Sequence, residues 1–102
     1  MIYLEVPDGW RRETERSIYK LQLAFPNVNV LQVKEKFGDL RIYYSMENTS
    51  EITAEIVERY ITALENHISS MCSVCGSREN IQRTDFPKWI LPYCEKHFPK
   101  EE

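Results

Sequence analysis

Four residues in the last third of the chain have the types and spacing of a metal site: Cys72, Cys75, Cys94 and His97. They form a C-x2-C-x18-C-x2-H pattern that uses all three cysteines of the chain. Thiolate sulfur and imidazole nitrogen are ligands that Zn²⁺ prefers, and four protein ligands close a tetrahedral structural site. We therefore expect a structural zinc ion here, with no open coordination position for catalysis.

A second cluster with chemical potential lies in the middle of the chain, around the glycine at position 38. Its members are Lys34, Lys36, Arg41, Tyr43 and Tyr44. Cationic side chains and turn amides can hold a phosphate, and an aromatic ring can stack on a base. The cluster thus predicts a binding site for a small anionic ligand. The alternative is a solvated hairpin, because Glu35 and Asp39 partly cancel the positive charge.

Catalytic patterns are otherwise sparse. No local motif joins serine, histidine and aspartate, and no Walker-type or dinucleotide glycine motif occurs. Metal ligation would occupy the thiols, which leaves no cysteine nucleophile. A metallonuclease would need a second metal site, for which His67 is the histidine outside the zinc pattern. We expect His67 to pack in the core, and we expect a protein that is not an enzyme.

The elements that must position these residues form an α+β fold. Asp8 is a plausible N-cap for a helix over 9–24. The segments 28–34 and 40–45 read as strands of an antiparallel hairpin with a glycine in its turn. A long amphipathic helix follows over 51–69, after a cluster of capping residues.

Alternation along the strands predicts which side chains share a face. Leu40, Ile42 and Tyr44 should face one way, and Arg41, Tyr43 and Ser45 the other. In the first strand, strict alternation predicts that one face carries Val28, Val30 and Gln32. The opposite face would carry Asn29, Leu31 and Val33. The long helix carries two adjacent apolar stripes that should pack together on the hairpin. They comprise Ile52, Ile56, Tyr60, Ala63 and His67, and beside them Val57, Ile61, Leu64 and Ile68.

We expect a body over residues 1–71 and a zinc module over 72–102 that packs on it, within one compact domain. The pair Cys75-Gly76 suits a tight knuckle. Residues 78–92 should form a loop or small hairpin, and 92–97 a turn that opens a short terminal helix. This order is typical of a treble-clef-like module, in which Trp89 would be a hydrophobic plug.

Composition limits the classes of function. The net charge of -3 disfavours a protein that coats nucleic acid non-specifically, because such a protein needs a broad basic surface. An odd number of cysteines argues against a disulfide framework, and reduced thiols fit the cytoplasm. The first residues lack the pattern of a signal peptide, and no stretch approaches the ~20 apolar residues of a membrane span.

Several short motifs occur together along the chain. They are Gly9-Trp10, the stretch Gln-Val-Lys-Glu-Lys-Phe-Gly-x-Leu-Arg-x-Tyr over 32–43, the C-x2-C-G knuckle, and a late tryptophan before C-x2-H. In this combination the chain resembles a family of small phage, prophage and bacterial proteins of unknown function. The knuckle here continues as Ser77-Arg78, where the family has Cys-Gly-x-Pro-Gly. The resemblance implies a zinc-containing accessory protein that acts in the host cytoplasm if phage-encoded.

The leading hypothesis is a zinc-stabilised binding protein that uses the hairpin to bind a signalling nucleotide or a host protein, and so counters host defence. A nucleic-acid-binding regulator is the first alternative. It would use cations of the zinc module, namely Arg78, Arg83, Lys88, Lys96 and Lys100. Nearby acidic residues offset those charges. A degenerate metallonuclease is the second alternative.

Overall fold

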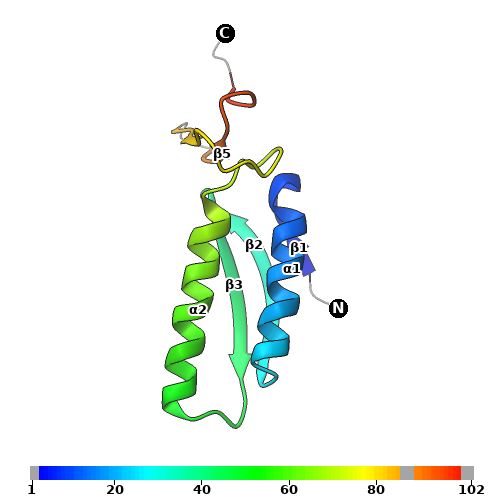
Figure 1. The fold of residues 1–102 in the computed structure, drawn as a ribbon, viewed down its shortest axis with the longest axis vertical. Helices are drawn as coiled ribbons and strands as arrows, with labels where there is room; N and C mark the ends of the chain where they lie inside the picture. The colour runs from blue at the N-terminus through cyan, green and yellow to red at the C-terminus, as the bar shows by residue number, and fades with distance from the viewer. Residues whose placement is uncertain (1–2, 86–88, 100–102) are drawn as a thin grey trace.

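The computed structural model describes residues 3–85 and 89–99 and shows a small α+β fold. Its elements are β1 (Tyr3–Glu5), α1 (Asp8–Ala24), β2 (Val28–Lys36), β3 (Asp39–Met46), α2 (Glu51–Ser69), β4 (Gln82–Arg83) and β5 (Pro92–Tyr93). The molecule is elongated, with extents of 54 × 24 × 24 Å. The region from residue 72 onward, here called the metal module, lies at one end of the long axis (Figure 1).

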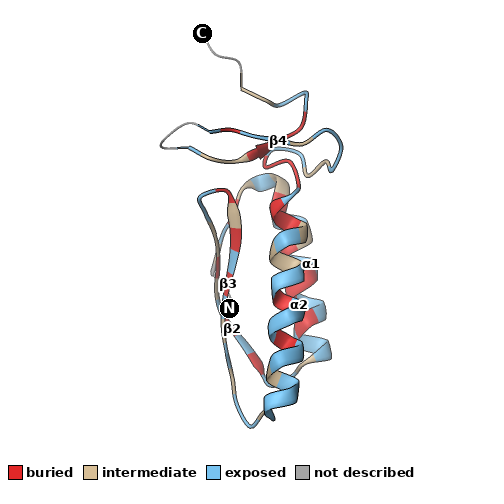
Figure 2. Ribbon diagram, turned by 90° about the vertical axis from the view of Figure 1, so that its left-hand side faces the viewer, coloured by how far each residue is buried: buried red, intermediate tan, exposed pale blue. Residues whose placement is uncertain are grey.

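The main sheet has the strand order β1-β2-β3. β2 and β3 form the predicted antiparallel hairpin, and β1 adds in parallel to the other side of β2. β1 is an element that the sequence did not reveal, because three residues are too few to display an alternating pattern. Both helices cover the same face of this sheet, and among the described residues no element covers the opposite face (Figure 2).

The hairpin is longer than predicted and its turn is shorter. β2 continues to Lys36 and β3 begins at Asp39, which leaves Phe37 and Gly38 as the two turn residues. Both have positive φ, 53° and 84°, as in the two-residue turns that match the twist of antiparallel strands. The Gly38 backbone N–H donates to the Glu35 carboxylate at 2.8 Å, which fixes the turn.

The strict alternation predicted for β2 is wrong after Val30, because a β-bulge lies between Val30 and Gln32. Val28 and Val30 share a face as predicted, and that face is buried, but Val33 lies on it and Gln32 does not. The extra residue, Leu31, remains 60% exposed. Strict alternation fails here because one added residue shifts every later side chain to the other face.

The two helices begin differently. The N-cap position of α1 is Pro7, and no side chain caps the helix, so the prediction that Asp8 is the N-cap is wrong. Asp8 is instead the first helical residue, where its carboxylate complements the positive end of the helix dipole. α2 has the predicted bounds, and the Ser50 side chain accepts a hydrogen bond from the Thr53 backbone N–H at 3.2 Å.

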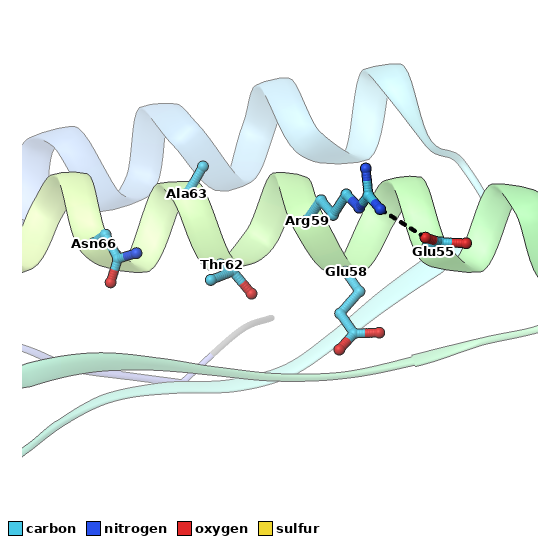
Figure 3. A pocket seen from close by; sticks show the side chains of 6 residues that line it. All are labelled: Glu55, Glu58, Arg59, Thr62, Ala63 and Asn66. Carbon is cyan, nitrogen blue, oxygen red and sulfur yellow. Dashed lines mark hydrogen bonds and ion pairs between the residues drawn. The ribbon is translucent and has the colours of Figure 1, made fainter.

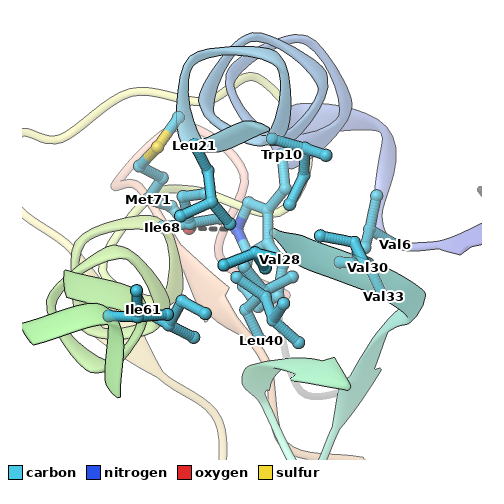
Figure 4. Packing of buried hydrophobic residues seen from close by; sticks show 13 residues of the cluster. Val6, Trp10, Leu21, Val28, Val30, Val33, Leu40, Ile61, Ile68 and Met71 are labelled. Atoms are coloured by element: carbon cyan, nitrogen blue, oxygen red, sulfur yellow. Dashed lines mark hydrogen bonds between the residues drawn. The ribbon is translucent and has the colours of Figure 1, made fainter. Parts of the chain in front are cut away.

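The core lies between the helices and the covered face of the sheet (Figure 4). Trp10 is fully buried at the end of the core nearest the metal module, and its indole N–H donates to the Met71 carbonyl at 2.8 Å. Of the two stripes predicted on α2, the one that contains Val57, Ile61 and Ile68 is buried. The long α2 packs on β3 through this stripe.

The prediction that the second stripe of α2 is also buried is wrong: Tyr60 is 38% exposed, Ala63 is exposed, and His67 is half-buried rather than packed in the core. The first two turns are more exposed still. Ile52 is 74% exposed and Ile56 is 52% exposed. The helices run in opposite directions, and the Phe25 ring, just past the end of α1, meets the Tyr60 ring edge-on at 5.8 Å. The first two turns of α2 therefore extend beyond α1, which leaves this part of the stripe uncovered.

Neither of the helices in the described part of the chain has the length and the apolar composition of a membrane span.

Side chains of α2 occupy the free edge of β3. The Leu40 backbone N–H donates to Ser69 Oγ at 2.8 Å, and the Ile42 N–H donates to Glu65 Oε2 at 2.9 Å. An edge strand exposes unpaired backbone groups that invite pairing with another chain. The two hydrogen bonds satisfy that edge in the half of β3 nearest the metal module.

Candidate metal centre

The four predicted ligands come together at the end of the body. One potential ligand atom from each of Cys72, Cys75, Cys94 and His97 lies within 4.8 Å of the others. The sulfurs of Cys75 and Cys94 are 3.7 Å apart, and His97 Nδ1 lies 3.2 Å from the Cys94 sulfur. Zn–S bonds of about 2.3 Å in a tetrahedron place sulfur atoms about 3.8 Å apart. The cluster therefore has the donor set and the dimensions of a tetrahedral metal site.

The first pair of ligands is held by a knuckle over residues 72–77. The Gly76 N–H donates to the Cys72 carbonyl at 2.9 Å, and the Cys72 N–H donates to the Ser77 carbonyl at 2.8 Å. Gly76 has φ of 79°, a conformation that favours glycine, as the Cys-Gly pair predicted. The Val74 N–H points at the Cys72 sulfur from 3.4 Å and stabilises negative charge there.

The environment changes the acidity of two thiols in opposite directions. Burial alone would raise the pKa of Cys72, but backbone N–H groups of Cys94, Cys75 and Val74 outweigh it and lower the pKa to about 6. The Ser77 backbone N–H lowers the pKa of Cys75, but burial and the neighbouring thiols outweigh this contact and raise the pKa. Cys72 is thus the ligand that the fold prepares as a thiolate, the form that binds metal.

The second pair of ligands follows a small hairpin made by β4 and β5. Thr84 lies between its arms: its N–H donates to the Leu91 carbonyl at 3.0 Å, and its hydroxyl donates to the Trp89 carbonyl at 2.9 Å. His97 N–H then donates to the Cys94 carbonyl at 3.1 Å. Residues 95–97 form a turn, and no helix follows it within the described residues up to position 99. The predicted terminal helix is therefore not seen there.

Aromatic side chains pack in the module beside the metal ligands. Tyr93 is buried, and the rings of Trp89 and Phe98 meet it edge-on at 5.9 and 6.3 Å. Trp89 itself is 42% exposed, so it covers the small core of the module only in part.

Two glycines join the knuckle to the start of α1. The Gly9 N–H donates to the Ser73 carbonyl at 2.9 Å. A Cβ atom at Gly9 would lie 2.8 Å from the Gly76 nitrogen and closer still to the Cys72 carbonyl oxygen, whereas a Cβ at Gly76 would lie 2.7 Å from the Gly9 oxygen. Only two residues without side chains allow the backbones to approach this closely. The knuckle is therefore seated directly on the first turn of α1.

A third glycine joins the β2–β3 turn to the other half of the module. A Cβ atom at Gly38 would meet the Arg83 guanidinium and would lie 2.7 Å from the Ile90 carbonyl oxygen. Arg83 Nη2 donates to the Phe37 carbonyl at 3.2 Å and lies 3.4 Å from an Asp39 carboxylate oxygen. The module thus contacts both the helix layer and the hairpin turn. Sequence reasoning missed these contacts because they join residues 44 or more positions apart.

The predicted anion site is assembled only in part. The register pairs Lys34 with Arg41 across the hairpin, and alternation puts Lys36 and Tyr43 on the same, uncovered face. The Lys34 ammonium lies 5.5 Å from the centre of the Tyr43 ring. Tyr44 does not belong to this group, because it lies on the face covered by helices. Burial there, together with the carboxylates of Glu58 and Glu65, raises the pKa of Tyr44.

Three residues of the alternative hypotheses, His67, Arg78 and Arg83, have internal partners, whereas Lys96 does not share in these contacts. His67 is half-buried, and its Nε2 atom lies 3.1 Å from the Arg78 guanidinium. Arg83 is engaged with the hairpin turn, and Lys96 is exposed. Lys88 and Lys100 fall outside the described residues.

A shallow hollow runs along α2 (Figure 3). Its lining residues are Glu55, Glu58, Arg59, Thr62, Ala63 and Asn66. All of them come from a single helix, and Arg59 pairs with Glu55 at 2.8 Å. With no second element to form an opposing wall, the hollow has no feature that selects a ligand.

Comparisons with protein-family models, with curated proteins and with solved structures find no match to the chain.

Proposed function

We propose that Cys72, Cys75, Cys94 and His97 hold a structural zinc ion. The support is the compact S₃N donor set, in which four protein ligands fill a tetrahedron and leave no position for substrate. We further interpret the module as treble-clef-like. A knuckle, a short hairpin and a turn with the second ligand pair follow in that order, with the turn in place of the usual terminal helix.

We propose that the protein as a whole is a non-catalytic binding protein that uses the uncovered face of the sheet. One observation carries this proposal: Lys34, Lys36 and Arg41 share that face with Tyr43, although the chain is acidic overall. Packing and turn geometry account for Val33, Gly38 and Leu40 in the same segment. They do not account for the three cations, which a purely structural hairpin would not need.

The form of this face favours a protein partner over a small nucleotide. Ligand pockets bury most of a small molecule, whereas protein partners bind to flatter surfaces. The hollows found beside α1, along α2 and on the module have other lining residues, and a fourth, beside Asp39 and Arg83, does not include Lys34, Lys36, Arg41 or Tyr43. If the resemblance to phage proteins holds, the partner is a host protein, and binding it counters a host defence.

The two alternative functions have weaker support. A nucleic-acid-binding regulator would need free cations on the metal module, but Arg78 contacts His67 and Arg83 contacts Asp39. A metallonuclease would need His67 as a metal ligand. The Arg78 cation beside His67 Nε2 disfavours a divalent metal ion at that position.

Affinity capture with charge-matched variants tests the proposed face. Partners captured by the wild-type protein are identified by mass spectrometry, and their affinities are then measured by calorimetry. Lys36→Ala combined with Arg41→Ala should weaken binding by up to about thirtyfold, because each cation contributes up to about 1 kcal/mol. The control combines Arg12→Ala with Lys20→Ala, two exposed cations of α1. Equal affinities of the two variants, at equal zinc content, would refute the assignment of this face.

A further inference from the structure

One cation of the metal module lies at the hairpin turn, where Arg83 and Asp39 line a hollow together with Ser69 and Ser70 of α2. Arg83, on β4, lies against Asp39 at 3.4 Å, and Asp39 pairs in register with Lys36 across the hairpin. Its guanidinium also donates to the Phe37 carbonyl, so it is fixed at the turn. Lys34, Lys36, Arg41 and Arg83 are called the cationic surface below.

Arg83 changes the charge that the sheet presents. Two carboxylates lie beside the cations of the sheet: Glu5, in register with Lys34, and Asp39, in register with Lys36. Without the docked module, Asp39 would offset the nearest lysine. With Arg83 in place, that carboxylate is paired and the cations of β2 and β3 remain available to a partner. The docked module therefore neutralises the Asp39 carboxylate beside the lysines of the sheet, and it also holds the hairpin turn in place.

The rest of the chain limits how far an anionic partner can extend. The chain has 13 Lys and Arg residues and 16 Asp and Glu residues. Four of those cations and two of those acids, Glu5 and Asp39, belong to this region. The remaining residues therefore carry a net charge of -5. A long polyanion such as a nucleic acid would be repelled beyond the cationic surface, whereas a short acidic segment of a protein would not.

The spacing of the cations fits an extended chain. Lys34 and Lys36 are two residues apart on one strand, which separates their side chains by about 7 Å. Alternate side chains of an extended peptide have the same separation, so two acidic residues at positions i and i+2 can face the two lysines. Tyr43, 40% exposed on the same face, adds an apolar contact beside them.

We propose that the cationic surface binds a short, extended acidic segment of a partner protein, and that it is complete only when the metal module is docked. This inference rests on the proposed function and names its partner chemistry. It also makes binding dependent on a residue of the module, Arg83, that the sequence alone had assigned to nucleic-acid contacts.

A designed peptide provides a direct test. The probe is a fluorescein-labelled 12-residue peptide of alternating Glu and Thr, and its binding is followed by fluorescence anisotropy at low salt. An alternating Gln and Thr peptide and a single-stranded oligothymidylate of matched length are the comparison ligands. The protein variants are Arg83→Ala and, as a control in the same module, Lys96→Ala, each checked for zinc content.

The expected result is preference for the Glu peptide, with Arg83→Ala weakening binding about threefold or more and Lys96→Ala leaving it unchanged. Chelation of the metal should weaken binding of the same peptide. If Arg83→Ala and Lys96→Ala change binding equally, Arg83 has no role in the surface. The proposed function would still stand in that case if Lys36→Ala combined with Arg41→Ala abolishes binding. Tighter binding of the oligothymidylate, or no preference for Glu over Gln, would overturn the acidic-segment assignment.

Discussion

Gly9 links the helix layer to the metal centre through close backbone contacts with Cys72, Ser73 and Gly76. A side chain there would collide with the Cys72 carbonyl and the Gly76 nitrogen, both parts of the knuckle. Gly9→Ala should therefore displace the first ligand pair and lower the free energy of unfolding by about 1–3 kcal/mol. It should also weaken metal binding. Competition with a chromophoric chelator measures the metal affinity, and denaturant unfolding measures the stability.

Gln22→Ala is the matched control for this substitution, because it adds no atoms and lies at an exposed position of the same helix. If Gly9→Ala binds zinc as tightly as Gln22→Ala, the seating of the knuckle on α1 does not influence the metal centre.

The low pKa of Cys72 predicts how the metal-free protein responds to pH. The folded-state pKa of about 6 lies below the ordinary value of 9.0, so folding favours the thiolate. The resulting stability is fully present above pH 9 and is lost as the pH falls toward 6. Thiolate absorbance at 240 nm should therefore show one thiol ionising near pH 6 while the protein is folded. The step should vanish in Cys72→Ser, and ionisation of all three thiols near pH 9 would contradict the prediction.

Residue types and short spacings were enough to predict which four side chains come together as a candidate metal site, because two pairs of fixed spacing constrain each other. They were not enough for Tyr44, which was grouped with Tyr43 although neighbours on a strand face opposite ways. The roles of Gly9 and Gly38 also stayed hidden. Each depends on a contact with a segment far along the chain, and no local pattern reports such a contact.

At the scale of elements, α2 protects the free edge of β3. Ser69 is buried, and its hydroxyl accepts from the Leu40 N–H while it donates to the Glu65 carbonyl at 2.6 Å. Ser69→Ala should leave the buried Leu40 N–H without a partner and cost about 1–3 kcal/mol of unfolding free energy. Chemical denaturation measures this loss.

The neighbouring serine provides the control. Ser70 is exposed, and its hydroxyl donates to the His67 carbonyl at 2.7 Å. Ser70→Ala should change the stability by no more than about 0.5 kcal/mol, as is usual for surface substitutions. Similar losses for both variants would show that the contact with β3 is not what makes Ser69 important.

Element prediction succeeded where caps and periodicity agreed. The bounds of α2 follow from Ser50 and the long apolar pattern after it. The exposed start of the same helix was not predictable, since it depends on where α1 ends. The bulge at Leu31 was also hidden, because an extra residue leaves no mark in the composition of a strand. Such features are decided by tertiary packing, which sequence periodicity does not encode.

At the scale of the molecule, the metal module closes one end of a narrow two-layer body. It contacts α1 through Gly9 and the hairpin through Gly38, and Met71 at its start accepts the hydrogen bond from Trp10. A chain of 102 residues buries a limited apolar core, so a metal ion held by the four clustered residues would contribute a large share of its stability. The same docking brings Arg83 beside Asp39, which connects the stability of the module to the proposed binding surface.

Metal content, measured together with stability, tests the central claim most directly. Protein purified without added zinc should contain about one zinc ion per chain by elemental analysis. Cys94→Ser should lower both the zinc content and the thermal unfolding temperature, because one of four ligands is lost. Protein that contains no metal, and that unfolds at the same temperature with and without a chelator, would contradict the account.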